Sequence, residues 1–480
     1  MNLQNLTISQ AQNGLLKKIF SVTELVKTCI TNIRKLEPKI NALITICEKE
    51  ALERAKDEDI KILRYKDTKR LFFEKPLLGI PLVLKDLYST KGIKTTAGSQ
   101  VLRDYVPIYD ATVVKRLKEA GVIIVGKSNL DAWAHGSSGE NSDFGPTRNL
   151  WNLDLVPGGS SSGSAASLSS GECLAATGTD TGGSVRLPAS FCNLVGLKPT
   201  YGRVSRYGII AMCSSMDSIG HFTRTVEDSA TILRVTAGKD PNDATTPNIP
   251  VPDYVKNIRQ GIKGLRIGIP KEYFIAGINK QIEAKIKDAL KKLAGLGAAM
   301  VPISLPHTQY SLAVYYIIQP AEVSSNLARF DGIRFGNQRS AFSAEAKRRI
   351  MLGTYTLSAG YYDAYYLKAM KVRSLITKDF EQAFKKVDVI AAPVSPTLPW
   401  KIGEKADDPL KMYMSDILTI PANLAGLPAL SIPVGFVQNL PVGMQIIGPQ
   451  FKEELIFKAG YSYQQVTDWH EKKPLYNNIK

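Results

Sequence analysis

Two segments rich in glycine and serine carry the residues whose types and spacing could do chemistry. They are residues 157–166 (PGGSSSGSAA) and 178–186 (GTDTGGSVR). Glycine lets backbone N–H groups approach a substrate oxygen without a clash at Cβ. A serine directly after two glycines can supply a nucleophilic hydroxyl. We interpret the two segments as an acyl-transfer site, which needs a nucleophile, a base and amides directed at the developing oxyanion.

The base of this site is predicted to be a lysine. The four histidines lie far apart in the sequence, and none has the setting of a known catalytic motif. Lys85 follows the apolar run 79–84 (GIPLVL), which predicts a buried strand with a charged residue at its exit. A lysine acts as a base only where burial lowers its pKa. The alternative is a surface lysine whose stem covers apolar side chains and whose ammonium reaches water.

Residues 157–166 are also compatible with simpler structures. A flexible linker fits poorly, because Ala165 and Ala166 begin a predicted helix directly and both flanks are apolar. A phosphate-binding loop of the Walker type needs Gly-Lys-Ser/Thr, and no lysine follows these glycines. A tight structural turn stays open as an alternative.

Composition indicates an ordinary globular protein. The chain has 480 residues, of which 44% are hydrophobic and 22% charged, and this usage excludes a disordered or fibrous protein. Its 61 basic and 44 acidic residues give a formal net charge of +17. This charge permits a nucleic-acid partner, but no basic and aromatic RNA-binding motif is present. We favour a solvated, lysine-rich surface.

Cysteine usage and hydropathy exclude other classes. The five cysteines are widely spaced and form no CxxC pair, so neither a zinc ribbon nor a disulfide framework is expected. The apolar runs are far shorter than a membrane span requires. The first residues (MNLQN) lack the basic and apolar regions of a secretory signal, so the expected compartment is the cytoplasm.

Helical and strand patterns alternate along the chain and predict an α/β sheet covered on both faces. A proline-rich joint at 239–256 either divides two domains or crosses the surface of one. Predicted helices cover 6–35, part of 49–75, 113–120 and 278–293; predicted strands cover 79–84, 122–125, 265–269, 300–305, 387–391, 430–434 and 442–447.

The chain resembles the amidase signature family in an ordered set of motifs. These are 79–86 (GIPLVLKD), the two Gly/Ser segments, and 196–202 (GLKPTYG). The resemblance implies an α/β/α sandwich around one mixed, mainly parallel central sheet. It also implies a single domain over 1–480, with N-terminal helices at 1–75, the Lys/Ser/Ser region at 76–230, and 260–470 completing the sheet and the substrate pocket.

The same resemblance implies a Ser–Ser–Lys triad. Ser184 would be the nucleophile, Ser160, preceded by a cis peptide bond, would relay the proton, and Lys85 would be the base. Asp180 and Arg186 flank the nucleophile, and we expect them to form a buried structural pair. The oxyanion hole would consist of backbone amides from Thr181, Gly182, Gly183 and Ser184.

Further stretches resemble the branch of the family formed by glutamine-hydrolysing subunits of tRNA-dependent amidotransferases. They are 202–208, 222–228, 324–332, 347–354, 358–366, 423–428 and 441–445. This branch implies free glutamine as the substrate, with Arg349 gripping its carboxylate and Asp416 facing its ammonium group. The alternative for both residues is a surface salt bridge.

The branch also implies partners and an absence of cofactors in this chain. Ammonia from glutamine would pass to the B subunit of a heterotrimer, which uses ATP and magnesium to convert Glu-tRNA(Gln) into Gln-tRNA(Gln), while a small C subunit wraps both. No metal or cofactor is expected in this chain, and no membrane association. Competing hypotheses are a stand-alone amidase and a non-catalytic scaffold or RNA-binding protein. Whether Asp-tRNA(Asn) also serves as a substrate stays open.

Three positions depart from the common family pattern. Ser162 replaces a usual glycine, Ala132 a common acidic residue and His135 a usual methionine. None of them is a proposed catalytic group. We expect His135 to line a wall or contact a partner.

Overall fold

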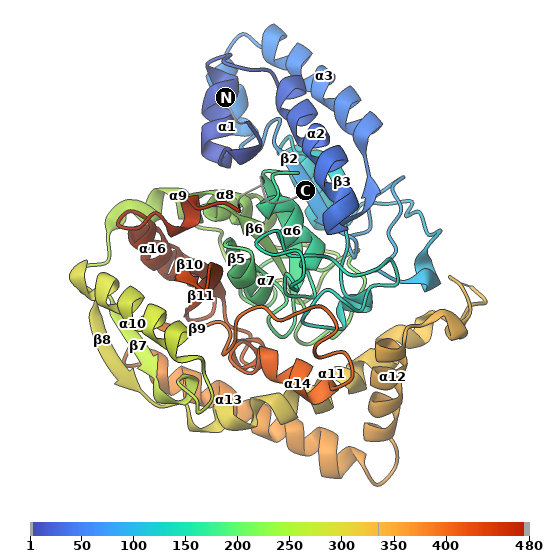
Figure 1. Ribbon diagram of the computed structural model, residues 1–480, viewed down its shortest axis with the longest axis vertical. Coiled ribbons are helices and arrows are strands. Elements are labelled where there is room, and N and C mark those ends of the chain that lie inside the picture. The colour runs from blue at the N-terminus through green and yellow to red at the C-terminus, as the bar shows by residue number, and fades with distance from the viewer. Residues whose placement is uncertain (1–2, 335, 475–480) are drawn as a thin grey trace.

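A single eleven-stranded sheet runs through the protein, and the computed structural model describes residues 3–334 and 336–474 (Figure 1). Residues 1–2, 335 and 475–480 of the predicted single domain lie outside this description. The strand order is β1-β3-β2-β4-β6-β5-β10-β11-β9-β7-β8. The strands are β1 (Leu43–Ile46), β2 (Pro81–Lys85), β3 (Ile123–Ser128), β4 (Ala175–Asp180), β5 (Val195–Lys198), β6 (Ser218–Thr223), β7 (Arg266–Pro270), β8 (Ala299–Ile303), β9 (Val389–Pro393), β10 (Ala429–Val437) and β11 (Leu440–Ile447).

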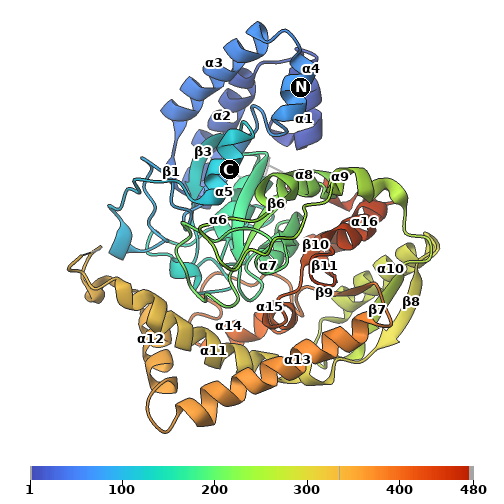
Figure 2. The same ribbon diagram turned by 180° about the vertical axis from the view of Figure 1, so that it is seen from behind.

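Helices cover both faces of the sheet, which confirms the predicted α/β/α class. Figures 1 and 2 show α1–α4 beyond one end of the sheet, and α10 with β7 and β8 towards the other. The helices are α1 (Ile8–Leu16), α2 (Val22–Ile40), α3 (Glu48–Arg64), α4 (Thr68–Glu74), α5 (Thr112–Glu119), α6 (Ser162–Ser169), α7 (Arg186–Phe191), α8 (Val226–Thr236), α9 (Tyr254–Asn257), α10 (Lys280–Gly295), α11 (Ser311–Asn326), α12 (Ala344–Thr356), α13 (Lys368–Phe384), α14 (Pro409–Tyr413), α15 (Ile420–Leu424) and α16 (Glu453–Gln464).

The sheet is mixed, as predicted. Parallel pairs form two groups, β3–β2–β4 and β9–β7–β8. Antiparallel pairs join these groups through β6, β5, β10 and β11, and add β1 at one edge. Strands from before and after the loop-rich joint at 239–256 therefore belong to one sheet. Among the described helices, none is long and apolar enough to cross a membrane.

The predicted helix over 6–35 consists of two helices. Lys18 has φ +56°, and the chain turns before Ser21 caps α2. The Ser21 side chain accepts a hydrogen bond from the Glu24 amide, and the Glu24 side chain accepts one from the Ser21 amide, which is the predicted capping box. Leu25, Cys29 and Ile33 lie on the buried face, as their spacing indicates.

The sequence patterns missed β4, a strand that is fully buried. Its sequence, AATGTD, contains two threonines, a glycine and an aspartate, so it lacks the apolar run of a typical buried strand. Two of its polar side chains, Thr177 and Thr179, form hydrogen bonds with Lys85. The strand is polar because it builds part of the site described next.

Candidate functional site

Lys85 lies at the end of β2 with its ammonium group enclosed by hydroxyls. The side chain is fully buried, and Nζ donates hydrogen bonds to Ser160 Oγ (2.8 Å), Ser161 Oγ (2.9 Å) and Thr179 Oγ1 (2.8 Å). A lysine that reaches water is therefore the wrong interpretation. Burial lowers the pKa of Lys85 to about 7, because desolvation disfavours the ammonium form. The neutral amine is thus available near neutral pH.

The loop before α6 brings Ser160 to Lys85. The Gly159–Ser160 peptide bond is cis, as the resemblance implied. The Gly159 amide donates to the Ser137 carbonyl (2.8 Å), and a Cβ on Gly159 would lie 2.1 Å from Asp131 Oδ2. The Asp131 amide in turn donates to the Ser160 carbonyl (3.2 Å). These contacts fix the loop on both sides, so it is neither a flexible linker nor a simple turn.

Residues 181–184 form a loop of unpaired amides at the end of β4. Within the described part of the chain, none of these four backbone N–H groups donates a hydrogen bond to the protein. Buried amides are almost always paired, so four in succession form a preorganised site for negative charge. The Thr419 hydroxyl donates to the Gly182 carbonyl (2.6 Å), and this hydrogen bond holds the loop in place.

Glycine is required at two positions of this loop. A Cβ on Gly182 would meet the Tyr315 ring at 2.9 Å. Gly183 has φ +142°, and a Cβ there would lie 2.2 Å from Thr419 Oγ1. The two glycines thus allow Tyr315 and Thr419 to pack directly against the backbone that presents the amides.

Ser184 ends the amide loop beside Ser160. Its side chain is 8% exposed, whereas Ser160 is fully buried. The Ser161 amide donates to the Ser184 carbonyl (3.3 Å), which holds the two serine segments next to each other. Among the described residues, the Ser184 hydroxyl has no hydrogen-bond partner, and no direct bond joins it to the Ser160 hydroxyl. The structure thus shows the Lys85–Ser160 contact directly and places Ser184 beside it.

Asp180 and Arg186 form the expected buried pair. Arg186 Nε and Nη2 each donate to the Asp180 carboxylate at 3.0 Å, and both side chains are fully buried. Burial would raise the pKa of Asp180, but the charge and hydrogen bonds of Arg186 outweigh it and lower the pKa to about 2. Arg186 also donates to Gln445 Oε1 (2.8 Å) and Asn423 Oδ1 (2.6 Å). The pair therefore joins the amide loop to the C-terminal half of the chain.

Asp416 lies next to the amide loop, at Gly183. A Cβ on Gly183 would be 3.4 Å from Asp416 Oδ1, and the Ser137 hydroxyl donates to Asp416 Oδ2. Burial raises the pKa of Asp416 to about 7, although the Ser137 hydrogen bond and the Arg349 charge oppose the rise. A surface salt bridge is the wrong interpretation for this residue.

Arg349 is buried on α12 and already holds two side chains. Nε donates to Glu345 Oε1 (2.8 Å) and Nη1 donates to Gln319 Oε1 (2.9 Å). The guanidinium carbon lies 5.4 Å from the ring centres of both Tyr316 and Tyr413. Within the described residues Nη2 makes no hydrogen bond, so one nitrogen is left for a ligand. The expected two-pronged grip would need the second N–H of Nη1 as well.

A small cavity adjoins Arg349. Its volume is about 130 Å³, and its walls include Gly136, Glu345, Arg349, Lys405 and Tyr413. It is thus formed where α12 and α14 approach the segment after β3. A cavity with an arginine and a carboxylate on its wall can receive a small zwitterion.

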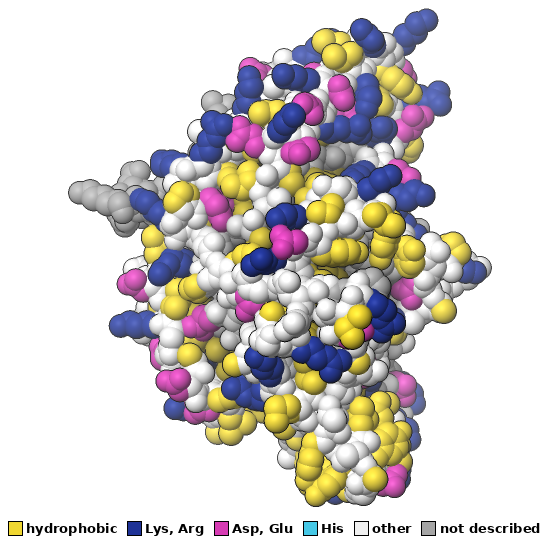
Figure 3. All heavy atoms as spheres, turned by 90° about the vertical axis from the view of Figure 1, so that its right-hand side faces the viewer, with side chains coloured by type: hydrophobic (Ala, Val, Ile, Leu, Met, Phe, Trp, Pro, Cys, Tyr) yellow, Lys and Arg dark blue, Asp and Glu magenta, His cyan; other side chains and the backbone are white. Residues whose placement is uncertain are grey.

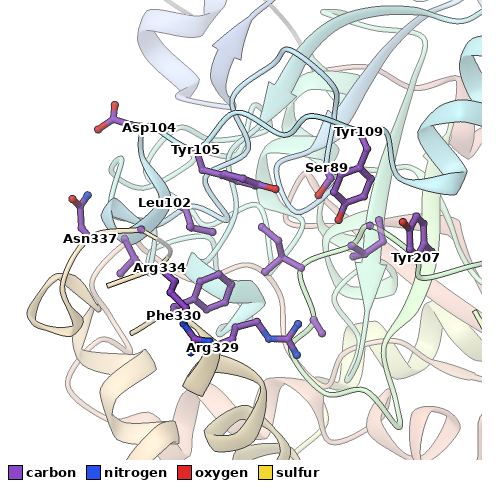
Figure 4. Close-up of a pocket in the computed structure, with 16 residues that line it drawn as sticks. Ser89, Leu102, Asp104, Tyr105, Tyr109, Tyr207, Arg329, Phe330, Arg334 and Asn337 are labelled. Carbon is purple, nitrogen blue, oxygen red and sulfur yellow. The ribbon is translucent and has the colours of Figure 1, made fainter. Parts of the chain in front are cut away.

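A larger cavity has none of Lys85, Ser160 and Ser184 on its wall. Its volume is about 680 Å³, and Figure 4 shows Tyr105, Tyr109 and Phe330 around it. A neighbouring cavity of about 220 Å³ shares Tyr207 with it and reaches Asp217. The Asp217 carboxylate accepts a hydrogen bond from the Thr181 hydroxyl (2.7 Å). The smaller cavity therefore approaches the amide loop at Asp217, directly before β6.

The three departures from the family pattern are all buried. The Ser162 hydroxyl donates to Thr147 Oγ1 (3.2 Å) and does not contact Lys85. His135 has no hydrogen-bond partner for either ring nitrogen within the described residues. Burial lowers the pKa of His135 well below its ordinary value, with the Arg349 charge acting in the same direction. His135 is therefore buried in its neutral form; whether it lines a wall or contacts a partner stays a prediction.

Several side chains of the site could not be identified from the sequence. Ser161 and Thr179 bind Lys85, Asp217 binds Thr181, and Gln319 binds Arg349. Glu345 is different, because its contact with Arg349 could have been predicted from the sequence. It lies four residues before Arg349, which is the spacing of neighbours on one helix face. Over 3–334 and 336–474, no group of three or more His, Cys, Asp or Glu side chains is arranged to hold a metal ion.

Comparisons with known proteins identify relatives of the chain. The amidase family model matches residues 24–457. The A subunit of glutamyl-tRNA(Gln) amidotransferase from Carboxydothermus hydrogenoformans is 52% identical over 99% of this chain and 100% of its own length. The structure of the A subunit of the same enzyme from Thermotoga maritima has a TM-score of 0.81 and 44% identity, covering 96% of this chain and 95% of that one. Peptide amidase from Stenotrophomonas maltophilia has a TM-score of 0.84 and 29% identity, covering 98% and 99%. The chain belongs to the amidase family.

Proposed function

We propose that the chain is the glutamine-hydrolysing subunit of the tRNA-dependent amidotransferase that converts Glu-tRNA(Gln) into Gln-tRNA(Gln). Relatives named as the A subunit of this enzyme match the chain over nearly its full length at about half identity. The observation that carries the chemistry is the buried Lys85 amine, 2.8 Å from the Ser160 hydroxyl and beside the unpaired amides of residues 181–184.

The first step is attack by Ser184 on the side-chain amide carbon of glutamine. Lys85 in its neutral form takes the proton of the Ser160 hydroxyl, and Ser160 takes the proton of Ser184 as the new C–O bond forms. The negative charge that develops on the carbonyl oxygen is stabilised by the amides of residues 181–184. Removing one such donor typically costs about 3–4 kcal/mol in the transition state.

In the next step the same groups transfer the proton in the opposite direction. The proton held by Lys85 returns through Ser160 to the leaving nitrogen, the C–N bond breaks, and ammonia departs from a glutamyl ester on Ser184. Water then attacks the ester carbon, with Lys85 and Ser160 again accepting the proton. Glutamate leaves and the Ser184 hydroxyl is restored.

Recognition of glutamine is assigned to Arg349 and Asp416. Glutamine presents one carboxylate and one ammonium group, and these two side chains supply one opposite charge for each. Asp416 lies next to Gly183, which precedes Ser184 in the chain. An ammonium group bound to the Asp416 carboxylate is therefore close to the nucleophile. Arg349 lies on the wall of the 130 Å³ cavity with Nη2 available.

In this proposal the ammonia passes to the B subunit of the complex. The C subunit holds this chain and the B subunit together. We assign no cofactor to this chain; ATP and magnesium belong to the subunit that activates Glu-tRNA(Gln). A chain that serves tRNA charging works where that charging takes place, so we place it in the cytoplasm.

The decisive experiment compares two serine variants in the complex with the B and C subunits. Ser184→Ala is expected to abolish ammonia release from glutamine, measured by a coupled glutamate dehydrogenase assay, while the complex still assembles. Ser162→Ala is the matched control, because among the described residues this buried hydroxyl of the same region bonds only to Thr147. Persistent ammonia release by Ser184→Ala would remove Ser184 from its assigned role.

Substrate choice is tested at Arg349. Arg349→Lys keeps a positive charge and loses the planar fork, so the KM for glutamine is expected to rise at least tenfold. Hydrolysis of propionamide, which has neither an α-carboxylate nor an α-ammonium group, should not change. An equal loss on both substrates would favour a stand-alone amidase whose Arg349 is structural.

A further inference from the structure

Asp131 is a buried carboxylate that the reaction described above does not use. Its side chain is fully buried. Two other buried carboxylates near the site have a cation at 3.0 Å, Asp86 with Lys127 and Asp180 with Arg186. Asp131 forms no ion pair with any of the described residues, and its carboxylate accepts hydrogen bonds from backbone amides instead.

These amides keep the Asp131 side chain charged. The Gly139 amide donates to both carboxylate oxygens (3.0 Å each), and the Asn141 amide donates to Oδ1 (2.9 Å). Burial raises the pKa of Asp131 to about 6, although the two amides oppose the rise; the Glu140 charge has a smaller effect in the same direction as burial. Asp131 is therefore an anion at neutral pH.

Two glycines let the carboxylate pack directly against the chain. A Cβ on Gly136 would lie 2.4 Å from Asp131 Cγ, and a Cβ on Gly159 would lie 2.1 Å from Asp131 Oδ2. Since a larger residue at either position would displace the carboxylate, the negative charge is held against the backbone of the Gly159–Ser160 segment.

Asp131 and Lys85 contact consecutive residues of that segment. The Asp131 carboxylate packs on Gly159, whereas Lys85 Nζ lies 2.8 Å from the Ser160 hydroxyl. The two charged groups form no direct ion pair. Electrostatic attraction still acts between them, because the interior around them has a low dielectric constant.

The attraction favours the charged form of Lys85. Burial is the larger effect and lowers the pKa of Lys85, but three carboxylates oppose it, with Asp131 the strongest, followed by Asp217 and Asp180. Asp180 already has its own cation, and Arg206 acts on Asp217. The cation that acts on Asp131 is Lys85 itself.

The proposed reaction creates a positive charge at Lys85. In its first step the neutral amine accepts the proton of the Ser160 hydroxyl and becomes an ammonium group. An ammonium group that forms away from water is costly unless a negative charge compensates it. A fixed carboxylate nearby reduces this cost in the transition state, where the charge develops.

We propose that Asp131 is a positioning residue of the amidase reaction, which acts through Lys85 by stabilising the ammonium group that forms when Lys85 accepts a proton. The inference rests on the proposed function, because the proton transfer to Lys85 is what creates that charge. It assigns a task to a side chain outside the Ser–Ser–Lys triad that touches neither the substrate nor the reacting atoms.

The test is the pH dependence of kcat for glutamine, measured in the complex with the companion subunits. Because kcat reports ionisations of the enzyme–substrate complex, in which the substrate's ammonium group already holds Asp416 in its charged form, its acid limb reports Lys85. Asp131→Asn removes the charge and keeps the shape. The midpoint of the acid limb should move to a pH lower by roughly 0.5–1, because the pKa of Lys85 falls without the negative charge. A weaker base transfers the proton more slowly, so kcat on the plateau should fall about threefold or more.

A second variant separates the charge from the hydrogen bonds. Asp131→Ser also removes the charge, but it leaves one short acceptor for the amides of Gly139 and Asn141, so the loop loses more hydrogen bonding than in Asp131→Asn. If the charge acts on Lys85, both variants move the midpoint by the same amount, whatever their plateau values. A role confined to holding the loop would lower kcat at every pH and leave the midpoint where it is in the wild type, which would overturn the inference.

The matched control is Asp228→Asn. Asp228 is also buried, accepts backbone amides from Ile8 (3.0 Å) and Ser9 (3.2 Å), and has its pKa raised to about 6 by burial. It joins α8 to the start of α1, so kcat and its midpoint should stay at the wild-type values. The thermal midpoints of the three variants show how much stability each has lost. An equal shift of the kcat midpoint in Asp228→Asn would also overturn the inference.

The failure of this inference differs from the failure of the proposed function. If the wild-type complex released no ammonia from glutamine, the proposed function would fail. If the wild type is active and both Asp131 variants keep its kcat midpoint, the inference alone fails.

Discussion

At the scale of single residues, the proposed chemistry depends on two pKa values, those of Lys85 and Asp416, which burial shifts in opposite directions. Burial lowers the pKa of Lys85 and raises that of Asp416, and each is brought to about 7. The lysine must be neutral to accept a proton, and the aspartate must be charged to hold an ammonium group. Both requirements are met only when the two groups are deprotonated, that is, above about pH 7.

The pH profile of the reaction should show both groups. Since kcat/KM reports ionisations of the free enzyme, log kcat/KM for glutamine should rise with slope two as the pH approaches 7 from below, and then level off. In Asp416→Asn the slope should fall to one and the KM should increase at least tenfold. Initial rates measured between pH 5.5 and 9 check this. A slope of one in the wild type would remove one of the two groups from its role.

The sequence named the residues to which we assign the reaction, but not most of their contacts. Lys85, Ser160 and Ser184 stand in ordered motifs, so the resemblance names them directly. Thr179 and Asp217 were missed because their contacts with Lys85 and Thr181 join residues 94 and 36 positions apart. Long-range pairing of this kind depends on strand order, which a single sequence does not determine.

At the scale of elements, strand ends and loop glycines position the site. β2 and β4 are parallel neighbours, so Lys85 at the end of one and residues 181–184 after the other meet at the same edge. The apolar run of β2 predicted that strand well. The polar strand β4 escaped prediction, because its threonines serve the site rather than a hydrophobic contact.

The amide loop provides an element-scale test. Gly183→Ala would place a Cβ 2.2 Å from Thr419 Oγ1 at φ +142°, so the loop must shift and its amides lose their alignment. We expect kcat to fall by about 10²–10³, the usual effect of losing one oxyanion donor.

The matched control for this substitution is Gly295→Ala at the end of α10. A Cβ there meets nothing within 4 Å, and the backbone is helical. We expect unchanged kcat and a free energy of unfolding raised by about 0.4–1 kcal/mol. Steady-state kinetics and urea unfolding measure both variants. Full activity in Gly183→Ala would show that the loop amides do not act on the transition state.

At the scale of the whole molecule, the site joins two halves of one sheet. Lys85, Ser160 and Ser184 come from the first half of the chain, whereas Arg349 and Asp416 come from the second. The Arg186 side chain bridges them through Gln445, 259 residues away. The catalysis and substrate recognition that we propose thus depend on long-range packing, although each half contains its own recognisable motif.

The net charge of +17 leads to a prediction about RNA for the molecule as a whole. On the face shown in Figure 3, Lys and Arg side chains are interspersed with Asp and Glu rather than collected into one basic stripe. A dispersed charge of this kind attracts RNA through counterion release, without selecting a sequence.

The isolated chain should therefore bind tRNA(Gln) and an unrelated RNA hairpin equally, with a Kd of roughly 10⁻⁴ to 10⁻⁶ M at physiological salt. Binding to both should weaken steeply between 50 and 200 mM salt, which fluorescence anisotropy with labelled RNAs can measure. Selective binding of tRNA(Gln) by the chain alone, with little response to salt, would contradict the prediction. It would mean that this subunit itself reads the tRNA, and that the surplus of lysine is more than a solvated surface.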